Sequence, residues 1–249
     1  MYDVIGSREK AVAILEREDR ELAEKILRTH KNVKSVLIKK SGRKGRFRLY
    51  EFKLFLGDSD TEVVHREYGM RFKLDPKKVY FSPREDTERQ RIASFVKEGE
   101  SVLVLFAGVA PYAIAIARKV RNCRIFCVEI NKQACKYARE NVKLNRVEGK
   151  VFVICADAGK IQFRKKFDRI VMPLPESAID FLPAAVKHAK KGSIIHLYSI
   201  SSGENLFSDV EKLIEEKLRG LARFRITGRQ KVLPYAPKKY KVRVDIMIL

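Results

Sequence analysis

Four residues that could handle a nucleoside follow four successive strands of a predicted parallel sheet. Gly108 comes shortly after the apolar run at 101–105, and Glu129, Asp157 and Pro173 stand where the next three strands end. The carboxyl ends of parallel strands meet at one edge of a sheet, and α/β proteins bind ligands in the crevice there. We therefore expect these four positions to line a single site.

The types and spacing of these residues favour an adenosine-containing ligand. Gly108 lets the backbone approach a ligand closely, and Glu129, which lies 21 residues further on, is suited to hold ribose hydroxyls. Asp157 could accept a hydrogen bond from an adenine amino group. Each acid also has a structural alternative, because Glu129 could favour the start of the next helix by its charge and Asp157 could cap a short turn. Asn131 is the better helix cap, which favours the ribose role for Glu129.

The loop after the first of these strands lacks the phosphate cradle of dinucleotide-binding proteins. It contains no Gly-x-Gly-x-x-Gly motif, and Phe106 stands where a glycine would suit a phosphate. This composition favours a nucleoside with an uncharged or zwitterionic tail, such as S-adenosylmethionine, over a dinucleotide.

The tripeptide Pro173-Leu174-Pro175 follows a strand at 168–172 and is unusual in this place. Methyltransferases that act on amino groups or ring nitrogens of bases often have a tripeptide here that begins with Asn or Asp and ends with Pro. Proline offers no side-chain hydrogen bond and lacks a backbone N–H. These residues leave two alternatives open, an inactive site or a different substrate.

A second group of residues that could take part in binding or catalysis lies around the start of a predicted helix at 86–96. Tyr80 could stack on a base, Arg89 could bind a carboxylate and Glu88 could accept a proton. Acidic residues at the start of a helix also suit the helix dipole, so ordinary helix-end electrostatics remains an alternative.

A basic stretch with interleaved aromatic residues precedes this group. Its residue types suit phosphate contacts combined with stacking on bases, although a solvated pair of strands could look the same. Its members are Arg43, Lys44, Arg46, Phe47, Arg48 and Tyr50.

The overall charge agrees with a nucleic-acid partner. The 249 residues include 53 Lys or Arg and 31 Asp or Glu, which gives a formal net charge of +22. Such an excess predicts a polyanionic partner, with nucleic acid ahead of an anionic membrane. A basic solvated surface linked to life at high temperature is the alternative.

The sequence gives no indication of a membrane protein, a secreted protein or a metal-binding protein. No apolar run is long enough to span a bilayer and residues 1–16 show no signal-peptide pattern, so we expect a cytoplasmic protein that contacts no membrane. The four cysteines form no Cys-x-x-Cys pair and have no histidine at zinc-like spacing, so no metal site is expected. No obligatory protein partner is evident.

The chain divides into two predicted domains. Residues 7–27 have helical spacing, and three short strands are expected at 36–38, 47–56 and 61–68, which predicts a small basic α+β RNA-binding domain over 1–78. From about residue 86 strands and helices alternate, which predicts an α/β domain with a doubly wound sheet over 79–249. Helices are expected at 86–96, 110–120, 132–145, 178–189 and 205–219, and strands at 101–105, 124–128, 151–154, 169–172 and 193–198, followed by an antiparallel edge pair at 223–232 and 240–248.

Taken together, these residues resemble those of the archaeal-type class I methyltransferases, with a Rossmann-like fold, that modify guanosine 37 of tRNA. The resemblance runs from about Val33 to the C-terminus. The motifs that carry it are His65-Arg66-Glu67-Tyr68-Gly69, Val79-Tyr80-Phe81-Ser82-Pro83-Arg84, Glu88-Arg89, Phe106-Ala107-Gly108-Val109, Asp168-Arg169-Ile170-Val171-Met172, Ile195-His196 and Tyr235-Ala236-Pro237.

The resemblance implies roles for particular residues. Glu88 matches the proton acceptor of the family, while Tyr80 and Arg48 match positions near the target base, with the Pro173 backbone beside them. S-adenosylmethionine would be the cofactor. The positions implied to bind it are Arg89, Phe106, Gly108, Glu129, Ile130, Asp157, Ala158 and Pro173.

Three departures from the family pattern bear on function. Typical members have Asn-Leu-Pro in place of Pro173-Leu174-Pro175 and Gly in place of Ala110, and the separate N-terminal tRNA-elbow domain is expected to be absent or reduced to 1–27. This chain resembles a branch of the family that has Pro-Leu-Pro at this position and looks bifunctional. That branch methylates N1 of guanosine 37 in tRNA(Phe) and later C7 of the tricyclic base 4-demethylwyosine, which gives isowyosine.

The resemblance therefore implies a tRNA methyltransferase of wyosine biosynthesis that binds the anticodon region of tRNA. Two alternatives stay open. The sister enzyme of the pathway transfers the aminocarboxypropyl chain of the same cofactor, and a non-catalytic tRNA-binding scaffold could keep a relic of the cofactor fold.

Overall fold

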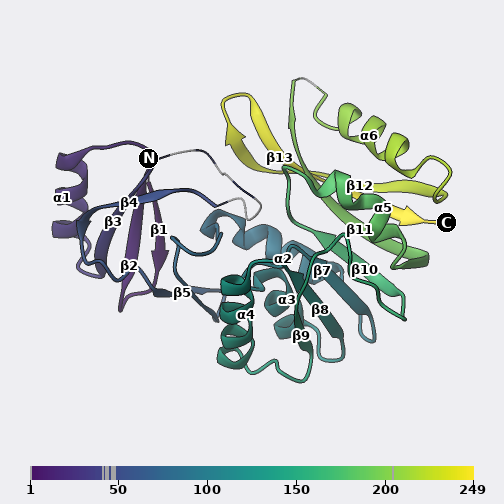
Figure 1. Ribbon diagram of the computed structural model, residues 1–249, viewed down its shortest axis with the longest axis horizontal. Coiled ribbons are helices and arrows are strands. Elements are labelled where there is room, and N and C mark those ends of the chain that lie inside the picture. Colours follow the sequence, from purple (N-terminus) through teal and green to yellow (C-terminus); the bar gives the residue numbers. More distant parts are fainter. Residues whose placement is uncertain (1, 41, 43–44, 46–48, 204) are drawn as a thin grey trace.

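The structure is a computed structural model that describes residues 2–40, 42, 45, 49–203 and 205–249. A four-stranded sheet near the N-terminus and a seven-stranded sheet lie towards opposite ends of the long axis (Figure 1). The predicted basic stretch falls largely outside the described residues, so its phosphate contacts stay a prediction. The members outside the description are Arg43, Lys44, Arg46, Phe47 and Arg48.

The N-terminal sheet is built around a parallel pair of strands joined by a helix. Its order is β1-β2-β3-β4, and β2 and β3 run parallel while the two outer pairs are antiparallel. Helix α1 starts where the Asp19 side chain accepts a hydrogen bond of 2.9 Å from the Leu22 N–H. The elements are β1 (Tyr2–Gly6), β2 (Ala11–Leu15), α1 (Arg20–Thr29), β3 (Val33–Lys39) and β4 (Phe52–Gly57).

The helical spacing over 7–27 predicts one or two helices, which is right for 20–27, where most of α1 lies, and wrong for 11–15, which form β2. All five residues of β2 are buried, since β2 lies between two strands and is covered on both faces. A strand buried on both faces has no alternation of apolar and polar residues. The spacing of Ala11, Ile14 and Leu15 therefore matched a helix without forming one.

A hairpin connects the N-terminal sheet to the second domain. It consists of β5 (Val63–Glu67) and β6 (Met70–Leu74), of which only the first was predicted. Asn141 in helix α4 (Lys132–Leu144) and Asn145, which follows that helix, hydrogen bond to the backbone of Lys73 and Arg71 respectively, with distances of 2.6 to 3.1 Å. The hairpin is thus bound to the larger domain, and a boundary at 78/79 stays our proposal.

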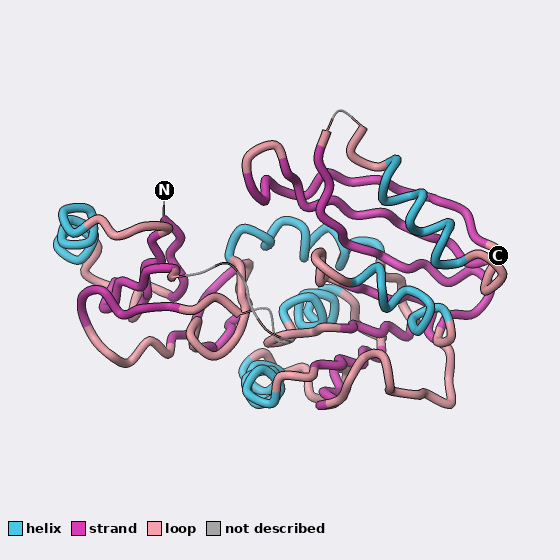
Figure 2. The backbone as a smooth tube through the Cα atoms, turned by 45° about the horizontal axis from the view of Figure 1, so that its top comes forward, coloured by secondary structure: helices cyan, strands magenta, loops and turns pink. Residues whose placement is uncertain are grey.

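The seven-stranded sheet confirms the predicted α/β class with a doubly wound sheet and a small N-terminal sheet. Its order is β12-β13-β11-β10-β7-β8-β9, with the first five strands of the domain parallel and the last two forming an antiparallel edge pair. Figure 2 shows the sheet from a second direction. The strands are β7 (Ser101–Leu105), β8 (Arg124–Glu129), β9 (Val151–Cys155), β10 (Phe167–Met172), β11 (Ala189–Ser202), β12 (Phe224–Ala236) and β13 (Lys239–Ile248).

Helices cover both faces of this sheet because its central strands are apolar on both sides. Val102 and Val104 of β7 belong to a core with α2, α3 and α4, while Leu103 and Leu105 belong to a core with α5 and α6. The helices are α2 (Asp86–Phe95), α3 (Pro111–Lys119), α4 (Lys132–Leu144), α5 (Leu182–Val186) and α6 (Ser208–Leu218), and 3₁₀ turns η1 (Pro83–Glu85) and η2 (Ala178–Phe181) precede α2 and α5.

The single helix predicted over 178–189 is wrong. The segment divides into η2 and α5, and its last residue, Ala189, already pairs with Phe167 as the start of β11. The N–H of Phe167 donates to the His188 carbonyl over 2.8 Å. Pairing with the neighbouring strand thus ends the helix earlier than apolar spacing predicts.

Candidate active site at the carboxyl ends of the strands

The loops after β7 and β8 meet at Glu129. Its Oε2 accepts a hydrogen bond of 2.8 Å from the Gly108 N–H, and its Oε1 accepts bonds of 2.9 and 2.8 Å from the N–H groups of Ile130 and Asn131. Burial raises the pKa of Glu129, and the three backbone N–H groups oppose that effect. Asn131 caps α4 through the Gln133 N–H, so Glu129 is not the helix cap.

The loop after β7 has an unusual backbone. Phe106, Gly108 and Ala110 have φ angles of 56°, 55° and 67°, in the left-handed region that glycine adopts most easily. Ala110, which replaces the family's glycine, is fully buried and begins α3 in this conformation. A Cβ on Gly108 would meet nothing closer than the Tyr80 carbonyl oxygen at 3.8 Å. The loop therefore leaves room beside its backbone, next to Tyr80.

The Phe181 side chain of η2 lies between the loop after β7 and the loop after β9 and contacts both. The Phe106 and Phe181 rings lie edge to face with centroids 4.9 Å apart, and a Cβ on Gly159 would lie 3.3 Å from the Phe181 ring. The Asp157 side chain accepts a 2.8 Å bond from the Gly159 N–H, and Ala158 is buried. Asp157 therefore does cap a turn, as one alternative predicted, and it does so in the predicted crevice.

The tripeptide after β10 reaches a neighbouring pocket. Pro173 is half-buried, Leu174 packs against the core beneath α5 and α6, and Pro175 lines the pocket. The Leu174 carbonyl accepts a 2.9 Å bond from the Ala178 N–H, which fixes the turn that follows. The strand order places this tripeptide directly beside the loop after β7.

Arg89 and Glu88 are both buried, and each already has a partner within the protein. The Arg89 guanidinium donates to both oxygens of Glu67 over 2.8 and 2.5 Å and also contacts the Ser82 carbonyl. The carboxylate that Arg89 binds in this structure is therefore that of Glu67. The resemblance implied a cofactor contact for Arg89, which stays a proposal.

Glu88 is 2% exposed and lies behind the pocket rather than in its wall. The Tyr198 hydroxyl donates to Glu88 over 2.7 Å, and Arg91 and Arg243 form ion pairs with its carboxylate. Arg243 in turn binds Asp245 over 2.8 Å. Glu88 is thus one end of a buried polar network that extends into the sheet.

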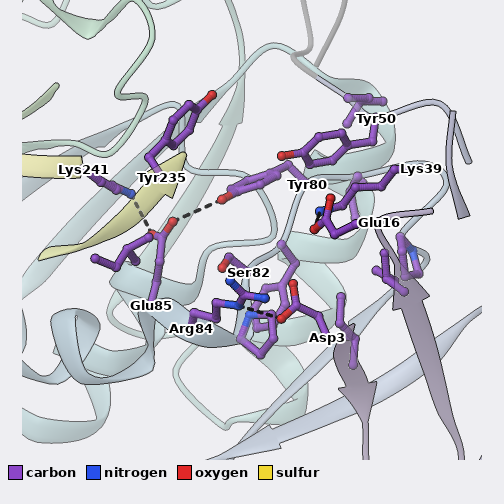
Figure 3. A pocket seen from close by; sticks show the side chains of 18 of the residues that line it. Asp3, Glu16, Lys39, Tyr50, Tyr80, Ser82, Arg84, Glu85, Tyr235 and Lys241 are labelled. Atoms are coloured by element: carbon purple, nitrogen blue, oxygen red, sulfur yellow. Dashed lines mark hydrogen bonds and ion pairs between the residues drawn. The ribbon is translucent and has the colours of Figure 1, made fainter. Parts of the chain in front are cut away.

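The pocket lies between the N-terminal sheet, η1 and the edge pair β12–β13 (Figure 3). Tyr80, predicted to stack on a base, lines it and donates a 3.1 Å hydrogen bond to Glu85. The ammonium of Lys241 lies 2.8 Å from Glu85 Oε2, and the Tyr112 hydroxyl donates to the same oxygen over 3.3 Å. Tyr235 also lines the pocket.

The local sequence of Glu85 and Lys241 does not mark them as pocket residues. Glu85 directly precedes a helix, where acidic residues are common, and Lys241 is one of several basic residues near the start of β13. Burial alone would raise the pKa of Glu85, but Lys241 and Arg89 outweigh it and hold that pKa below its usual value. The pocket therefore contains a buried carboxylate and a buried ammonium side by side.

Membrane and metal features are absent from the part of the chain that the structure describes. Within those residues no helix is long and apolar enough to cross a membrane. They also contain no group of three or more His, Cys, Asp or Glu side chains that could hold a metal ion.

Comparison with known proteins assigns this chain to a family. The family described as TRM5/TYW2 methyltransferase domain matches residues 63–225. The chain is 37% identical over 254 residues to the tRNA (guanine(37)-N(1))-methyltransferase Trm5b of Pyrococcus abyssi, covering 99% of this chain and 74% of that protein. It is 32% identical over 307 residues to the tRNA (guanine(37)-N(1))/4-demethylwyosine(37)-methyltransferase Taw22 of Nanoarchaeum equitans, covering 100% and 99%.

A solved structure agrees over the whole chain. The complex of aTrm5 with tRNA(Leu) superposes with a TM-score of 0.86 at 31% identity, covering 100% of this chain and 72% of that one. The predicted class I methyltransferase fold is therefore confirmed. The chain belongs to the TRM5/TYW2 methyltransferase family, which confirms the S-adenosylmethionine-dependent methyltransferase predicted from its sequence.

Proposed function

We propose that the protein methylates N1 of guanosine at position 37 of tRNA, and C7 of 4-demethylwyosine at the same position. One observation carries the proposal. A pocket with an aromatic wall and a buried carboxylate lies directly beside the loop predicted to hold the cofactor, and Tyr80 contributes to both. The names of the Trm5b and Taw22 relatives support the two reactions.

The described residues fit S-adenosylmethionine at the ends of β7 and β8. Glu129 holds a carboxylate where ribose hydroxyls would donate, and the open side of Gly108 gives the cofactor access to the backbone. Phe106 beside Phe181 offers an apolar wall for an adenine ring. Ile130, Asp157 and Ala158 complete the proposed site, and the cofactor would supply the methyl group on its sulfonium.

The pocket fits a flat base taken out of an RNA stack. Tyr80 and Tyr235 offer ring faces, and Tyr50 lies beside Tyr80 from the side of the N-terminal sheet (Figure 3). Base recognition in single-stranded RNA commonly combines such stacking with hydrogen bonds to the base edge. The N-terminal sheet would therefore hold the RNA while the edge pair β12–β13 closes the other side.

We propose that Pro173 extends the substrate range to the tricyclic base. An Asn in this place would offer a polar grip on guanine, and its replacement by proline removes that grip. Pro175 lines the pocket, so the tripeptide borders the space that a larger and flatter ring system would need. Arg48, which the resemblance places near the base, lies outside the described residues and stays a prediction.

Glu88 remains our proposed proton acceptor for N1 methylation, although it does not line the pocket. The Tyr112 hydroxyl donates to Glu85 in the pocket and the Tyr198 hydroxyl donates to Glu88, while the two tyrosine rings pack edge to face with centroids 5.9 Å apart. We propose that a proton leaves the pocket for Glu88 through these two neighbouring tyrosines. Both methyl transfers need the acceptor atom in line with the sulfonium methyl, so positioning is expected to contribute most of the rate.

The charge of the chain supports tRNA as the partner. A net charge of +22 favours an anionic backbone, and tRNA binding is expected to weaken steeply with salt. We propose the anticodon region of tRNA, including that of tRNA(Phe), as the binding site and the cytoplasm as the location, without an obligatory protein partner.

The test supplies purified protein, S-adenosylmethionine and tRNA with either guanosine or 4-demethylwyosine at position 37. Nucleoside digests analysed by mass spectrometry are expected to show 1-methylguanosine from the first tRNA and isowyosine from the second. The heavier aminocarboxypropyl adduct would support the sister enzyme, and tRNA binding without any product would support a non-catalytic scaffold. Product from guanosine alone would remove the wyosine part of the proposal.

A further inference from the structure

Lys241 presents a buried ammonium group to the pocket. It is 2% exposed, lies on β13 and lines the pocket, with its Nζ 2.8 Å from Glu85 Oε2 and 4.8 Å from the centroid of the Tyr198 ring. Despite the short ion pair, none of the described residues accepts a hydrogen bond of good geometry from Nζ. Glu85 therefore balances the charge of Lys241, while N–H groups of the ammonium remain to be satisfied.

A buried donor without an acceptor is costly, so such a group in a pocket wall indicates a ligand that completes it. The proposed function supplies that ligand. Guanine has a carbonyl oxygen at C6, directly beside N1, and the tricyclic base keeps this carbonyl although its N1 has become part of the added ring. A donor to this oxygen would serve both substrates.

We propose that Lys241 donates a hydrogen bond to the C6 carbonyl oxygen of the target base, with Glu85 as the residue that positions its ammonium. This inference rests on the proposed function. Removal of the N1 proton places negative charge partly on that oxygen, and a preorganised ammonium in a buried pocket stabilises such charge. Lys241 is then a catalytic residue for N1 methylation.

The step balances without any further reactant. The N1–H bond breaks and the proton passes to the carboxylate acceptor, and the freed electron pair of N1 forms the bond to the methyl carbon. The electron pair of the broken carbon–sulfur bond returns to sulfur. Lys241 keeps its own protons throughout, because its part is to lower the cost of the N1 anion.

The surroundings of Lys241 fit this role. Figure 3 shows Lys241, Glu85 and Tyr80 joined in one row of contacts, with Tyr235 next to the ammonium. A base stacked on these tyrosines would have its edge towards Lys241. Glu85 is held from the other side by Tyr112, so its carboxylate is fixed when it meets the lysine.

The experiment compares Lys241→Met with the wild-type protein in single-turnover methylation of guanosine-37 tRNA between pH 6 and 9. The matched control is Lys239→Met, which removes the same charge from an exposed position on the same strand. We expect Lys241→Met to lower the rate roughly 100-fold at neutral pH, with unchanged cofactor affinity by calorimetry. The loss is expected to shrink as pH rises, because alkali removes the N1 proton without help from the protein.

Three outcomes would overturn the inference: an unchanged rate, an equal loss at every pH, or a similar loss with Lys239→Met. If Lys241→Met does not fold, the double variant Glu85→Gln/Lys241→Met, which removes both buried charges together, undergoes the same pH series. Lys241→Arg, which keeps the charge, is expected to recover part of the rate. If the wild-type protein methylates no guanosine-37 tRNA, the proposed function itself is contradicted. Failure of the proposed function is in this way distinguished from failure of the role proposed for Lys241.

Discussion

The backbone N–H of Gly108 and the carboxylate of Glu129 are joined by a hydrogen bond of 2.8 Å. This bond connects the loop after β7 to the end of β8, two neighbouring strands whose carboxyl ends open on the same crevice. The carboxylate also accepts two backbone bonds from the start of the next loop. Glu129 is therefore fixed in position by the fold itself, before any ligand binds.

Glu129→Ala is expected to abolish S-adenosylmethionine binding while the chain still folds, with lower stability. The substitution removes the acceptor proposed for the ribose hydroxyls and also the acceptor of three backbone N–H groups, whereas Asn131 still caps α4. Isothermal calorimetry measures the affinity, and circular dichroism checks the fold. Glu148→Ala, an exposed position after the same helix, serves as the control. Unchanged cofactor affinity in Glu129→Ala would contradict the assignment.

Glu67→Gln is expected to lower the free energy of unfolding by about 2–4 kcal/mol. Glu67 accepts two hydrogen bonds from Arg89, and both side chains are almost completely buried. Glutamine leaves the guanidinium without its anion in a site of low polarity. Urea denaturation followed by circular dichroism measures the change. A loss below 0.5 kcal/mol, a limit typical of surface changes, would show that Ser82 suffices as a partner.

The same pair predicts a pH dependence. Burial alone would raise the pKa of Glu67, but His65 and Arg89 outweigh burial and hold this pKa below its ordinary value of 4.5. The stabilisation of the fold by ionised Glu67 is therefore complete above about pH 4.5, the pKa expected for this residue in the unfolded chain. It is lost as the pH falls through the lower pKa of Glu67 in the folded protein. The difference in unfolding free energy between the wild type and Glu67→Gln should shrink in acid. A constant difference down to pH 3 would contradict this argument.

Asn141→Ala is expected to destabilise the protein by about 2–3 kcal/mol. Asn141 is fully buried and bonds to both backbone groups of the half-buried Lys73 and to the Val109 carbonyl, so the substitution leaves three backbone groups without this partner. Thermal unfolding measures the effect, with the exposed Lys143→Ala on the same helix as control. An equal and small loss in both variants would show that the hairpin is held by its apolar contacts alone.

The larger domain could be predicted well from the sequence because its signals are local. The runs at 101–105, 124–128 and 169–172 are short and predominantly apolar and alternate with helical segments, so the strands are clear. Strand order then brings Gly108 and Glu129 together, and their bond confirms that convergence. The same reasoning could not separate a doubly buried strand from a helix, which is why β2 was missed.

The pocket could not be predicted because its charges come from distant parts of the chain. Lys241 on β13 reaches Glu85 of η1 only through the antiparallel pairing of the last strands with the rest of the sheet. Likewise Glu88, predicted from its motif, meets Arg243 and Tyr198 from two other strands. Sequence gives a residue's type and neighbours along the chain, whereas long-range pairing decides whether a carboxylate faces a pocket or a buried network.

Pro173→Asn tests whether the tripeptide sets substrate range. Pro173 is half-buried at the end of β10, and Pro175 two residues later lines the pocket, so the change alters the pocket border without removing a charge. An Asn restores the polar grip of typical family members and narrows the space for a tricycle. We expect N1 methylation of guanosine to continue within about threefold, a small change in barrier height, while C7 methylation of 4-demethylwyosine falls at least tenfold. Digests of both tRNAs, each quantified at single turnover, give the two rates from one preparation. Equal loss of both reactions would mean that Pro173 supports the site as a whole and does not select between the two bases.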